Sequence, residues 1–331
     1  MVCLATFEGR NQADDQALNQ PCSALIPPDA LRALNARSDR AGWLQVLGHA
    51  GLIGAAGWVW ANPSIAWAVR IPALLLFGLG LAFAFCAMHE CGHRTAFKSR
   101  ALNDTVAWWA GVLSFYNADF YRRYHQWHHR HTHQPGLDPE LESAPPTSRW
   151  GYLLELSGLP WWIAKLRGHA AGLRGAFSAN PYIPADAVAA VRSSLWKQAA
   201  VYGVLLLLSL PGGNGFLLWF WLLPLALGQP LLRFVLLAEH SGCGTGTDGL
   251  SNTRTTHTLA PLRWLMWNMP FHAEHHLFAS IPFHALPAAH AWIAPGLEHN
   301  DRGYLALHRR FLARPELLAL PAAAPNRPQP V

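Results

Sequence analysis

Residues Ile65 to His93 read IAWAVRIPALLLFGLGLAFAFCAMHECGH, an apolar run that ends directly in a pair of histidines. The apolar part, Ile65 to Met88, is long enough to cross a bilayer as one helix. His89 and His93 are four residues apart, so they lie on one side of such a helix. The stretch therefore predicts a membrane helix that carries possible metal ligands at one end.

The composition of the whole chain favours a membrane protein. Of the 331 residues, 51% are hydrophobic and 13% are charged, whereas about a quarter are charged in soluble domains. Three further apolar runs approach spanning length: Trp43 to Ala61, Leu195 to Leu210 and Phe216 to Leu237. Short helix-breaking turns at residues 62–64 and 211–215 return each pair of helices to its starting side. We predict an all-α membrane protein with four transmembrane helices in two hairpins and a cytoplasmic histidine-rich helical cap.

The basic residues predict the orientation, because Lys and Arg concentrate in cytoplasmic loops. They cluster before the first run and after the second, and neither hairpin turn contains one. Both termini and all the histidine clusters are then cytoplasmic in an integral, multi-pass protein. The net charge of +6 fits attraction to the headgroups of membrane lipids. No nucleic-acid-binding module is recognisable, so we expect no nucleic-acid partner.

The chain divides into three predicted regions. Residues 1–40 form a cytoplasmic N-terminal segment without a cleavable signal pattern, and residues 41–291 form the membrane domain. Residues 292–331 form a C-terminal segment that ends in a Pro-rich, disordered tail. Between the hairpins, Val106 to Phe115 predicts a re-entrant or surface-lying helix, and Tyr152 to Arg174 an interfacial amphipathic helix.

Two more histidine clusters follow the first. They are His125-Gln-Trp-His128-His129 and His272-Ala-Glu-His275-His276. On a helix, the three histidines of each cluster span roughly a third of a turn. A single cluster is as readily a group of solvent-facing histidines as a ligand set. Three such clusters in one membrane protein indicate a polynuclear metal site at the membrane surface.

The types of residue in and near the clusters limit which metal ions this site is expected to bind. Eight imidazoles exceed the needs of one tetrahedral zinc ion, and the five Cys residues form no thiolate motif. Of the carboxylates near the clusters, Glu90 alone has Glu-x-x-His spacing, and the carboxylate diiron bundle needs two such motifs. Two metal ions that share the imidazoles and leave a position open for dioxygen are the simplest assignment. Iron is the expected ion for oxygen chemistry.

The order HxxxH, HxxHH, HxxHH resembles the membrane fatty acid desaturase and hydroxylase superfamily. Residues 130–132 and 138–140 after the middle cluster, and residues 268–270 before the third, strengthen the resemblance, which covers Leu47 to Ala291. It implies a non-haem diiron centre at the cytoplasmic end of four transmembrane helices. Its metal ligands at matching positions are His89, His93, His125, His128, His129, His272, His275 and His276, with His240 as a ninth after the fourth helix.

Other residues near the clusters have less certain roles. We expect His131 to be exposed or to lie behind the ligands, and His133 to lie beyond the helix and not to bind metal. His257 is expected near the site. Glu90 and Glu274 are predicted either to orient ligating imidazoles or to be solvated on the opposite helix face. Four tryptophans are candidates for lining an acyl tunnel: Trp108, Trp109, Trp264 and Trp267.

These features predict oxygen-dependent desaturation of an acyl lipid or acyl thioester by two iron ions. A hydroxylase or ketolase of an acyl chain, carotenoid or alkane would use the same site. A zinc membrane hydrolase or a non-catalytic metal-binding membrane protein is the alternative of another class. The sequence contains no flavin fingerprint, iron-sulfur pattern or fused cytochrome segment. We therefore expect an external electron donor of the ferredoxin, rubredoxin or cytochrome type on the basic inner surface.

Overall fold

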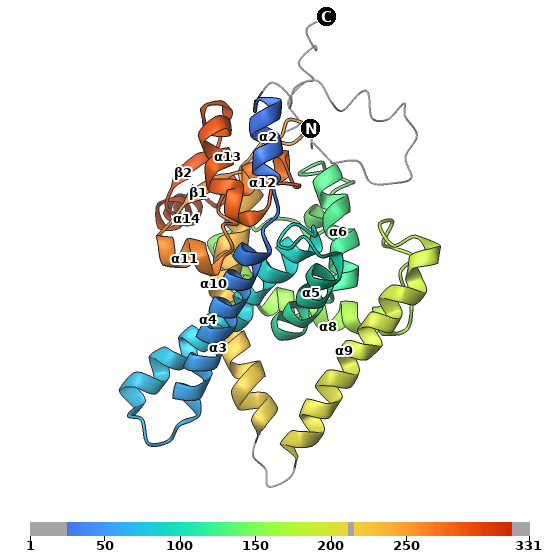
Figure 1. Cartoon of the computed structure of the whole chain (residues 1–331), viewed down its shortest axis with the longest axis vertical. Coiled ribbons are helices and arrows are strands. Elements are labelled where there is room, and N and C mark those ends of the chain that lie inside the picture. The colour runs from blue at the N-terminus through green and yellow to red at the C-terminus, as the bar shows by residue number, and fades with distance from the viewer. Residues whose placement is uncertain (1–24, 211–214, 320–331) are drawn as a thin grey trace, which may run out of the picture.

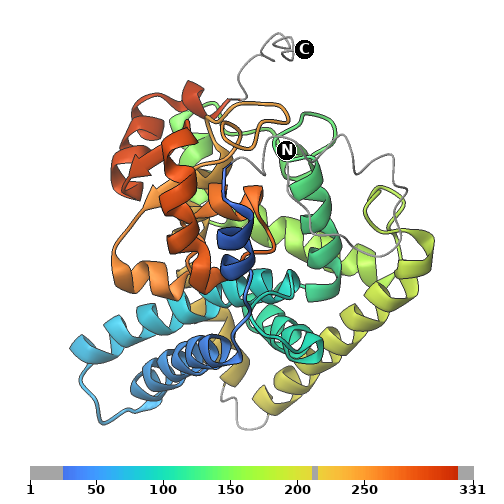
Figure 2. The ribbon, with the colours of Figure 1, turned by 45° about the horizontal axis from the view of Figure 1, so that its top comes forward.

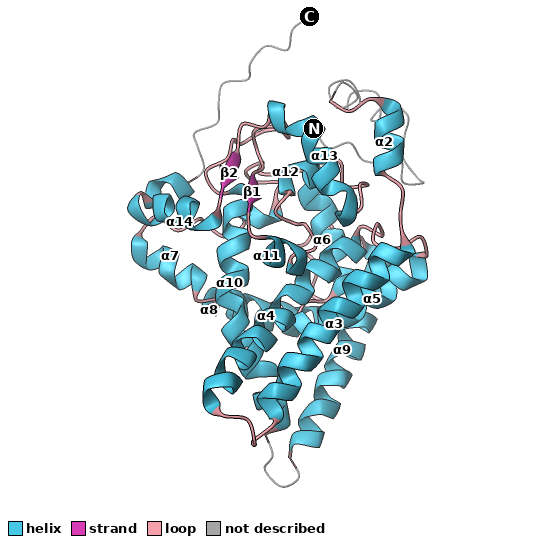
Figure 3. Ribbon diagram, turned by 60° about the vertical axis from the view of Figure 1, so that its left-hand side comes forward, coloured by secondary structure: helices cyan, strands magenta, loops and turns pink. Residues whose placement is uncertain are grey.

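The computed structural model describes residues 25–210 and 215–319, and these residues are mostly helical (Figures 1 and 3). The helices are α2 (Pro28–Leu34), α3 (Asp39–Ala61), α4 (Trp67–Gly92), α5 (Arg100–Ser114), α6 (Ala118–Arg130), α7 (Arg149–Leu156), α8 (Leu159–Leu173), α9 (Val188–Ser209), α10 (Leu223–His240), α11 (Ala260–Leu265), α12 (His272–Leu277), α13 (Leu286–Ile293) and α14 (Tyr304–Ala313). A π-helical turn, η5 (Leu218–Leu222), leads into α10. Strands β1 (Thr255–His257) and β2 (Asn300–Arg302) pair in parallel.

Two helices among the described residues are long and apolar enough to cross a membrane. They are Trp67–Gly92, which is α4, and Leu218–His240, which joins η5 to α10. Helices α3 and α9 match the other two predicted runs and have 23 and 22 residues, but they fall short of the same apolar character. The long helices extend together toward one end of the molecule, and α11 to α14 gather at the other (Figure 1). The predicted turn at 211–214, the first 24 residues and the tail from 320 lie outside the described residues.

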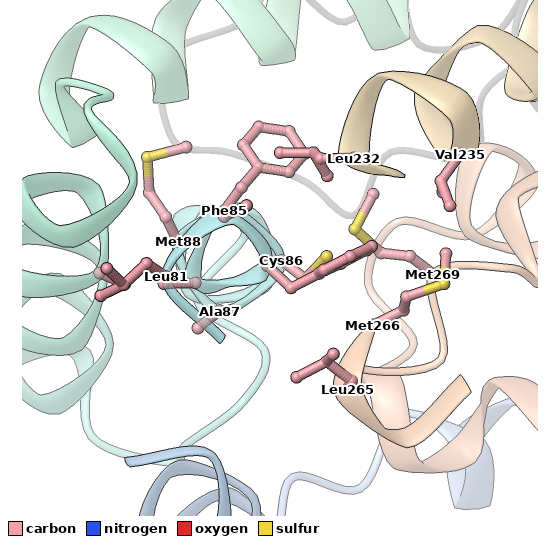
Figure 4. Packing of buried hydrophobic residues seen from close by; sticks show 14 of the residues in the cluster. Leu81, Phe85, Cys86, Ala87, Met88, Leu232, Val235, Leu265, Met266 and Met269 are labelled. Carbon is pink, nitrogen blue, oxygen red and sulfur yellow. The ribbon is translucent and has the colours of Figure 1, made fainter. Parts of the chain in front are cut away.

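Helix α4 is the centre of the apolar core. It packs against α3, α5 and α10, and Figure 2 shows α3 and α4 side by side. In Figure 4, Phe85 of α4 lies beside Leu232 of α10, while Leu81 and Met88 point toward the opposite side. Leu81, Met88 and Leu232 are buried. Because α4 is buried along the half that ends in the first histidine cluster, its end has a fixed position in the fold.

Helices α4 and α10 touch through their backbones. A Cβ atom on Gly78 would lie 2.2 Å from the carbonyl oxygen of Pro224, and one on Gly228 would lie 2.1 Å from the carbonyl oxygen of Gly78. Real Cβ contacts are never this short, so no larger residue fits at either position without a shift of backbone. The two glycines permit the close crossing of the helices that carry the first cluster and His240.

The end of α10 is fixed by a buried arginine. Arg254 donates hydrogen bonds from Nη1 to the carbonyl oxygens of Ala238 and Ser241, both at 2.7 Å. Its Nε donates to Asp301, 2.7 Å away in β2. A buried cation needs such partners, because an unpaired charge in the interior is costly. Arg254 thus links α10 to the small parallel ladder that covers the histidine end of the fold.

The connecting region between the hairpins differs from the prediction in its details. The expected helix at Val106 to Phe115 is the second half of α5, which begins at Arg100. The expected interfacial helix at Tyr152 to Arg174 is divided into α7 and α8 at Gly158, whose φ of 75° is left-handed. Glycine adopts this conformation without steric cost, which explains the break.

Candidate metal centre

The three histidine clusters meet at one place although they lie far apart in the chain. His89 is in the last turn of α4, and His93 caps its end. The second cluster lies in the last turns of α6, a helix that starts where the Asn117 side chain accepts a hydrogen bond from the Phe120 backbone N–H. The third cluster is α12 itself, in which every residue is buried. The ends of α4 and α6 and the whole of α12 thus form one histidine-lined interior.

The larger set of imidazoles, the five-histidine group, draws on all three helices. One ring nitrogen of each member lies within 4.8 Å of one from every other member. The members are His89, His93, His125, His129 and His275. Two pairs are spaced four residues apart on α4 and α6, so helix geometry brings them together. Ligands about 2 Å from a common ion lie at such separations, so this group can surround one ion.

The smaller set, the three-histidine group, consists of His128, His240 and His276. Each member has its Nδ1 atom fixed by a neighbouring polar group, which leaves Nε2 available. The contacts are His128 Nδ1 to Asp138 Oδ1 at 2.8 Å, His240 Nδ1 to the Asn252 carbonyl oxygen at 3.1 Å, and His276 Nδ1 to Thr132 Oγ1 at 3.1 Å. Metal-binding histidines are commonly oriented through the other ring nitrogen in this way.

His272 lies at the edge of the three-histidine group. Its Nε2 atom is 3.2 Å from His240 Nε2 and 3.5 Å from Glu239 Oε2. Glu140 Oε2 approaches His128 Nε2 to 3.8 Å, and Glu140 can also share an ion with His125 and His128. Ring-to-ring contacts thus link all nine histidines proposed as ligands into one cluster, and two carboxylates adjoin it at His128 and His272.

The buried ring nitrogens fit bound metal. Several have no hydrogen-bond partner, including both ring nitrogens of His89, Nδ1 of His129 and Nε2 of His275 and His276. An unpaired buried polar atom is costly, and coordination to a cation would satisfy it. Imidazole donors suit iron, copper, nickel and zinc. The residues therefore fit two neighbouring ions bound by imidazole.

One histidine of the two groups, His128, differs from the others in its electrostatics. Burial lowers the pKa of His125, His129 and His275, so these rings are neutral, the form that binds metal. Burial also opposes charge on His128, but the carboxylates of Glu140 and Asp138 raise its pKa to about 9. Burial lowers the pKa of the other two members of the three-histidine group, His240 and His276, so the protein favours positive charge at His128 alone.

Glu90 and Glu274 have neither of the roles predicted for them. Both are buried rather than solvated, with exposed fractions of 3% and 0%. Glu90 accepts hydrogen bonds from Thr95 Oγ1 and the Phe283 backbone N–H. Glu274 Oε2 accepts from Thr255 Oγ1, and its Oε1 contacts His290 Nδ1. The carboxylates position the segments that carry the ligands, because buried acids need partners, and they contact no proposed ligand.

The remaining histidines lie outside both groups. His131 caps the end of α6 and packs on Trp127. His133 has a left-handed φ of 56° and contacts the Gly244 carbonyl oxygen through Nδ1. His257, expected near the site, is exposed in β1 and contacts Asn300. The helix break after His131 removes His133 from the face of the second cluster, and strand pairing turns His257 away.

The four tryptophans do not line the cavity at the histidines. That cavity, of about 320 Å³, is bordered by Phe85, Tyr116, Tyr121 and Tyr124 together with charged residues. Trp108 and Trp109 border a different cavity, beside Arg122 and Arg123. Trp267 is buried and donates a hydrogen bond to His49. The abundance of tryptophan in the sequence was therefore a poor guide to the walls of the cavity.

Sequence reasoning also missed the groups that orient the three-histidine group. Thr132 and Asp138 fall within segments that strengthen the family resemblance, but the sequence predicts no role for them or for Asn252. Asp138 is ten residues beyond His128, outside any helical spacing. The Asp138-Pro139 pair, which starts the short 3-10 helix Pro139–Leu141, was the available signal, since Asp caps such turns.

The fold and the histidine-lined interior together define a helical protein with two membrane-competent helices and buried histidine groups that could hold metal. The chain belongs to the fatty acid desaturase family, whose model matches residues 65–308. It is similar to the sn-1 oleoyl-lipid 12-desaturase of Synechocystis sp., with 26% identity over 243 residues, which are 64% of this chain and 65% of the relative. The sn-1 oleoyl-lipid 12-desaturase of Picosynechococcus sp. is 28% identical over 107 residues, 30% of this chain and 31% of the relative. The chain thus spans less than two thirds of the length of both curated relatives.

Proposed function

We propose that this protein is a membrane desaturase that removes two hydrogens from an acyl chain, using dioxygen and two iron ions. The observation that carries the proposal is the meeting of nine histidines from three clusters and the end of α10 in one buried interior. Family membership supports it, as do relatives named as oleoyl-lipid desaturases.

The proposed ligands divide between the two ions. His89, His93, His125, His129 and His275 would hold one ion, and His128, His240, His272 and His276 would hold the other. Bound iron would supply the reduction of dioxygen and the removal of hydrogen from an unactivated carbon, for which side chains have no equivalent chemistry. The chain orients the imidazoles through Asp138, Asn252 and Thr132. It also excludes water by burying α12.

We propose that four helices, α3, α4, α9 and η5–α10, cross the membrane, with the histidine end and both termini in the cytoplasm. The ends of α4 and α10 at the histidines adjoin basic residues such as Arg94, Lys98 and Arg100, as cytoplasmic ends do. Electrons would come from a ferredoxin-, rubredoxin- or cytochrome-type protein that docks on this basic side. The rate of electron transfer from the donor to this protein should fall as ionic strength rises, and such a fall would support the docking.

The test is metal analysis combined with product analysis on the purified protein. We expect two iron ions per chain, reductant-dependent dioxygen uptake and a product two mass units lighter than the substrate. Absence of iron together with full activity of histidine variants would refute the proposal. A product sixteen mass units heavier would instead identify a hydroxylase, the alternative that uses the same site. Hydrolysis without dioxygen uptake would identify a zinc hydrolase.

A further inference from the structure

A second cavity, of about 760 Å³, lies between α5 and α6, two helices that are neighbours in Figure 1. Among the described residues, no histidine lines it, and the proposed reaction makes no use of it. Its wall includes Trp108 and Trp109, which the sequence suggested for an acyl tunnel, together with several arginines. Ligand cavities commonly measure ~300–1,000 Å³, so this one is large enough for a ligand of its own.

The charges of this cavity do not cancel. Four arginines and two aspartates line it: Arg94, Arg100, Arg122, Arg123, Asp104 and Asp119. Asp104 accepts hydrogen bonds from both Arg94 and Arg122, at 2.6 to 3.0 Å, so one carboxylate serves two guanidinium groups. Across the described residues, Arg100 and Arg123 form no ion pair within 4 Å. Even if each aspartate offsets one arginine, two positive charges remain for a bound anion.

Two neighbouring arginines of α6 are fixed in the wall of the cavity. Arg122 has a side chain that is 14% exposed, and its Nε donates a hydrogen bond to the carbonyl oxygen of Gly92 at 3.1 Å. Arg123 Nη1 donates to the backbone carbonyl oxygen of Asp119 at 2.8 Å. Guanidinium groups held in this way are arranged in advance for phosphate, which they bind through paired N–H donors.

The tryptophans of the cavity lie beside the end of α4, which is apolar enough to cross a membrane. A Cβ atom on Gly111 of α5 would lie 3.3 Å from the sulfur of Met88 in α4. Trp108 and Trp109 are therefore level with the last turn of α4, whose final residue, Gly92, contacts Arg122. With α4 across the bilayer as proposed, this is the membrane surface, where tryptophan is enriched.

We propose that the cavity binds the phosphate of an anionic phospholipid from the surrounding membrane, with the lipid chains against the two tryptophans. Trp109 is 52% exposed and offers an apolar surface next to the arginines. A soluble phosphate makes no use of such a surface, and the face of an acidic protein does not reach a side chain as recessed as Arg122. The inference rests on the membrane placement in the proposed function, but not on the reaction.

A lipid bound here contacts the helix that carries the second histidine cluster. Arg122 is three residues before His125 on α6, less than one helical turn. The lipid therefore stabilises the start of α6 without contact to a proposed metal ligand, and it is separate from the acyl substrate, because no histidine lines this cavity within the described residues.

The test is native mass spectrometry of the purified full chain in detergent, titrated with phosphatidylglycerol or with phosphatidylcholine of the same acyl chains. We expect phosphatidylglycerol to bind about tenfold more tightly. An arginine near a membrane surface contributes on the order of fivefold in affinity for anionic lipid. Arg100→Gln and Arg123→Gln should each weaken phosphatidylglycerol binding by about that factor, and phosphatidylcholine binding by no more than about twofold. Trp109→Ala should weaken both lipids alike and keep the preference.

The controls separate a built site from general attraction to basic residues. Arg167→Gln, at an exposed arginine of α8 outside the cavity, should keep the full preference for phosphatidylglycerol. Equal binding of the two lipids, or an equal loss in the Arg167→Gln variant, would overturn the inference. Displacement of the lipid by millimolar glycerol 3-phosphate would overturn it too, since it would identify a site for soluble phosphate.

Two further outcomes distinguish this inference from the proposals for the reaction and for the electron donor. If Arg100→Gln and Arg123→Gln slowed electron transfer from a donor protein but kept phosphatidylglycerol binding, the cavity would be a protein docking surface and the inference would be wrong. Lipid binding is measured without reductant. Preference for phosphatidylglycerol in a protein that desaturates no acyl chain would therefore leave the inference standing and count against the proposed function.

Discussion

The five-histidine and three-histidine groups lie side by side but are held in different ways. In the five-histidine group, rings pack on one another and on Tyr121, which stacks on His125 at 5.1 Å between ring centres. In the three-histidine group, every Nδ1 is hydrogen-bonded to a group from a loop or a helix end. Helix geometry and ring packing thus orient the imidazoles of the five-histidine group, whereas hydrogen bonds to polar groups orient those of the three-histidine group. We expect the two metal positions to respond to different substitutions.

The largest effect should come from removing a ligand of either group. We expect His129→Ala to empty the five-histidine position and His276→Ala to weaken the three-histidine position, each lowering activity by more than the ~100-fold expected of an outer partner. Iron per chain, measured by elemental analysis, should fall toward one. His257→Ala, at an exposed histidine outside both groups, is the matched control. An equal loss of iron in the His257→Ala variant would show that the loss in the other two variants is not specific to the two histidine groups.

Asp138→Asn should give the next largest effect. The asparagine keeps the shape but loses the negative charge that holds His128 Nδ1 at 2.8 Å. We expect metal affinity at the three-histidine position to fall about 10- to 100-fold, with the other position unchanged. Mössbauer spectra of protein loaded with ⁵⁷Fe would show which signal is lost. Asp119→Asn, on α6 without a contact from its carboxylate to the histidines, should leave both signals intact.

Tyr121→Leu tests the packing of the five-histidine group. Loss of the ring stacked on His125 should cost about 0.5–1.5 kcal/mol, and therefore weaken iron binding at that position a few-fold. Tyr121→Phe keeps the ring and should bind iron as the natural protein does. If the leucine variant instead weakened the three-histidine position alone, packing would not be what orients the larger group.

Thr132→Val should give an effect about as small as that of Tyr121→Leu, but at the three-histidine position. It removes the 3.1 Å contact between Thr132 Oγ1 and His276 Nδ1 while keeping the shape of the side chain. A neutral hydrogen bond contributes about 1 kcal/mol, so we expect roughly fivefold weaker metal binding at the three-histidine position. Thr132→Ser should restore it. A titration that distinguishes the two positions, with the five-histidine position as internal reference, provides the measurement.

The sequence predicted the long helices and the shared helix face within each histidine cluster, because both follow from local periodicity, and the number of clusters suggested that they meet. It did not predict how the histidines divide between two groups. His128 and His129 are adjacent, as are His275 and His276, yet each pair contributes one member to each group. Neighbouring residues on a helix point about 100° apart, so adjacent histidines point in different directions. Which group each one joins depends on the helices that lie in that direction. That is a tertiary property.

The orienting groups were unpredictable for the same reason. Asn252 reaches His240 through a backbone carbonyl, and any residue type supplies one. Thr132 contacts a histidine 144 positions away in the chain. Glu90 and Glu274 were adjacent to ligands in sequence, but on a helix adjacency directs a side chain away from its neighbour. Their carboxylates accordingly contact other segments.

Helices α4 and α10 cross where Gly78 contacts Gly228, and this close contact fixes the angle between the two helices. His89 is eleven residues beyond Gly78 and His240 is twelve beyond Gly228, so the helix segments from the crossing to these histidines are about 16 and 18 Å long. A change of about 5° in the angle between the two helices moves the end of one by about 1.5 Å relative to the end of the other, a large fraction of the ~3.5–4 Å between ions in a paired site. If two ions bind as proposed, their separation would therefore depend on two glycines in the apolar layer that touch no proposed ligand.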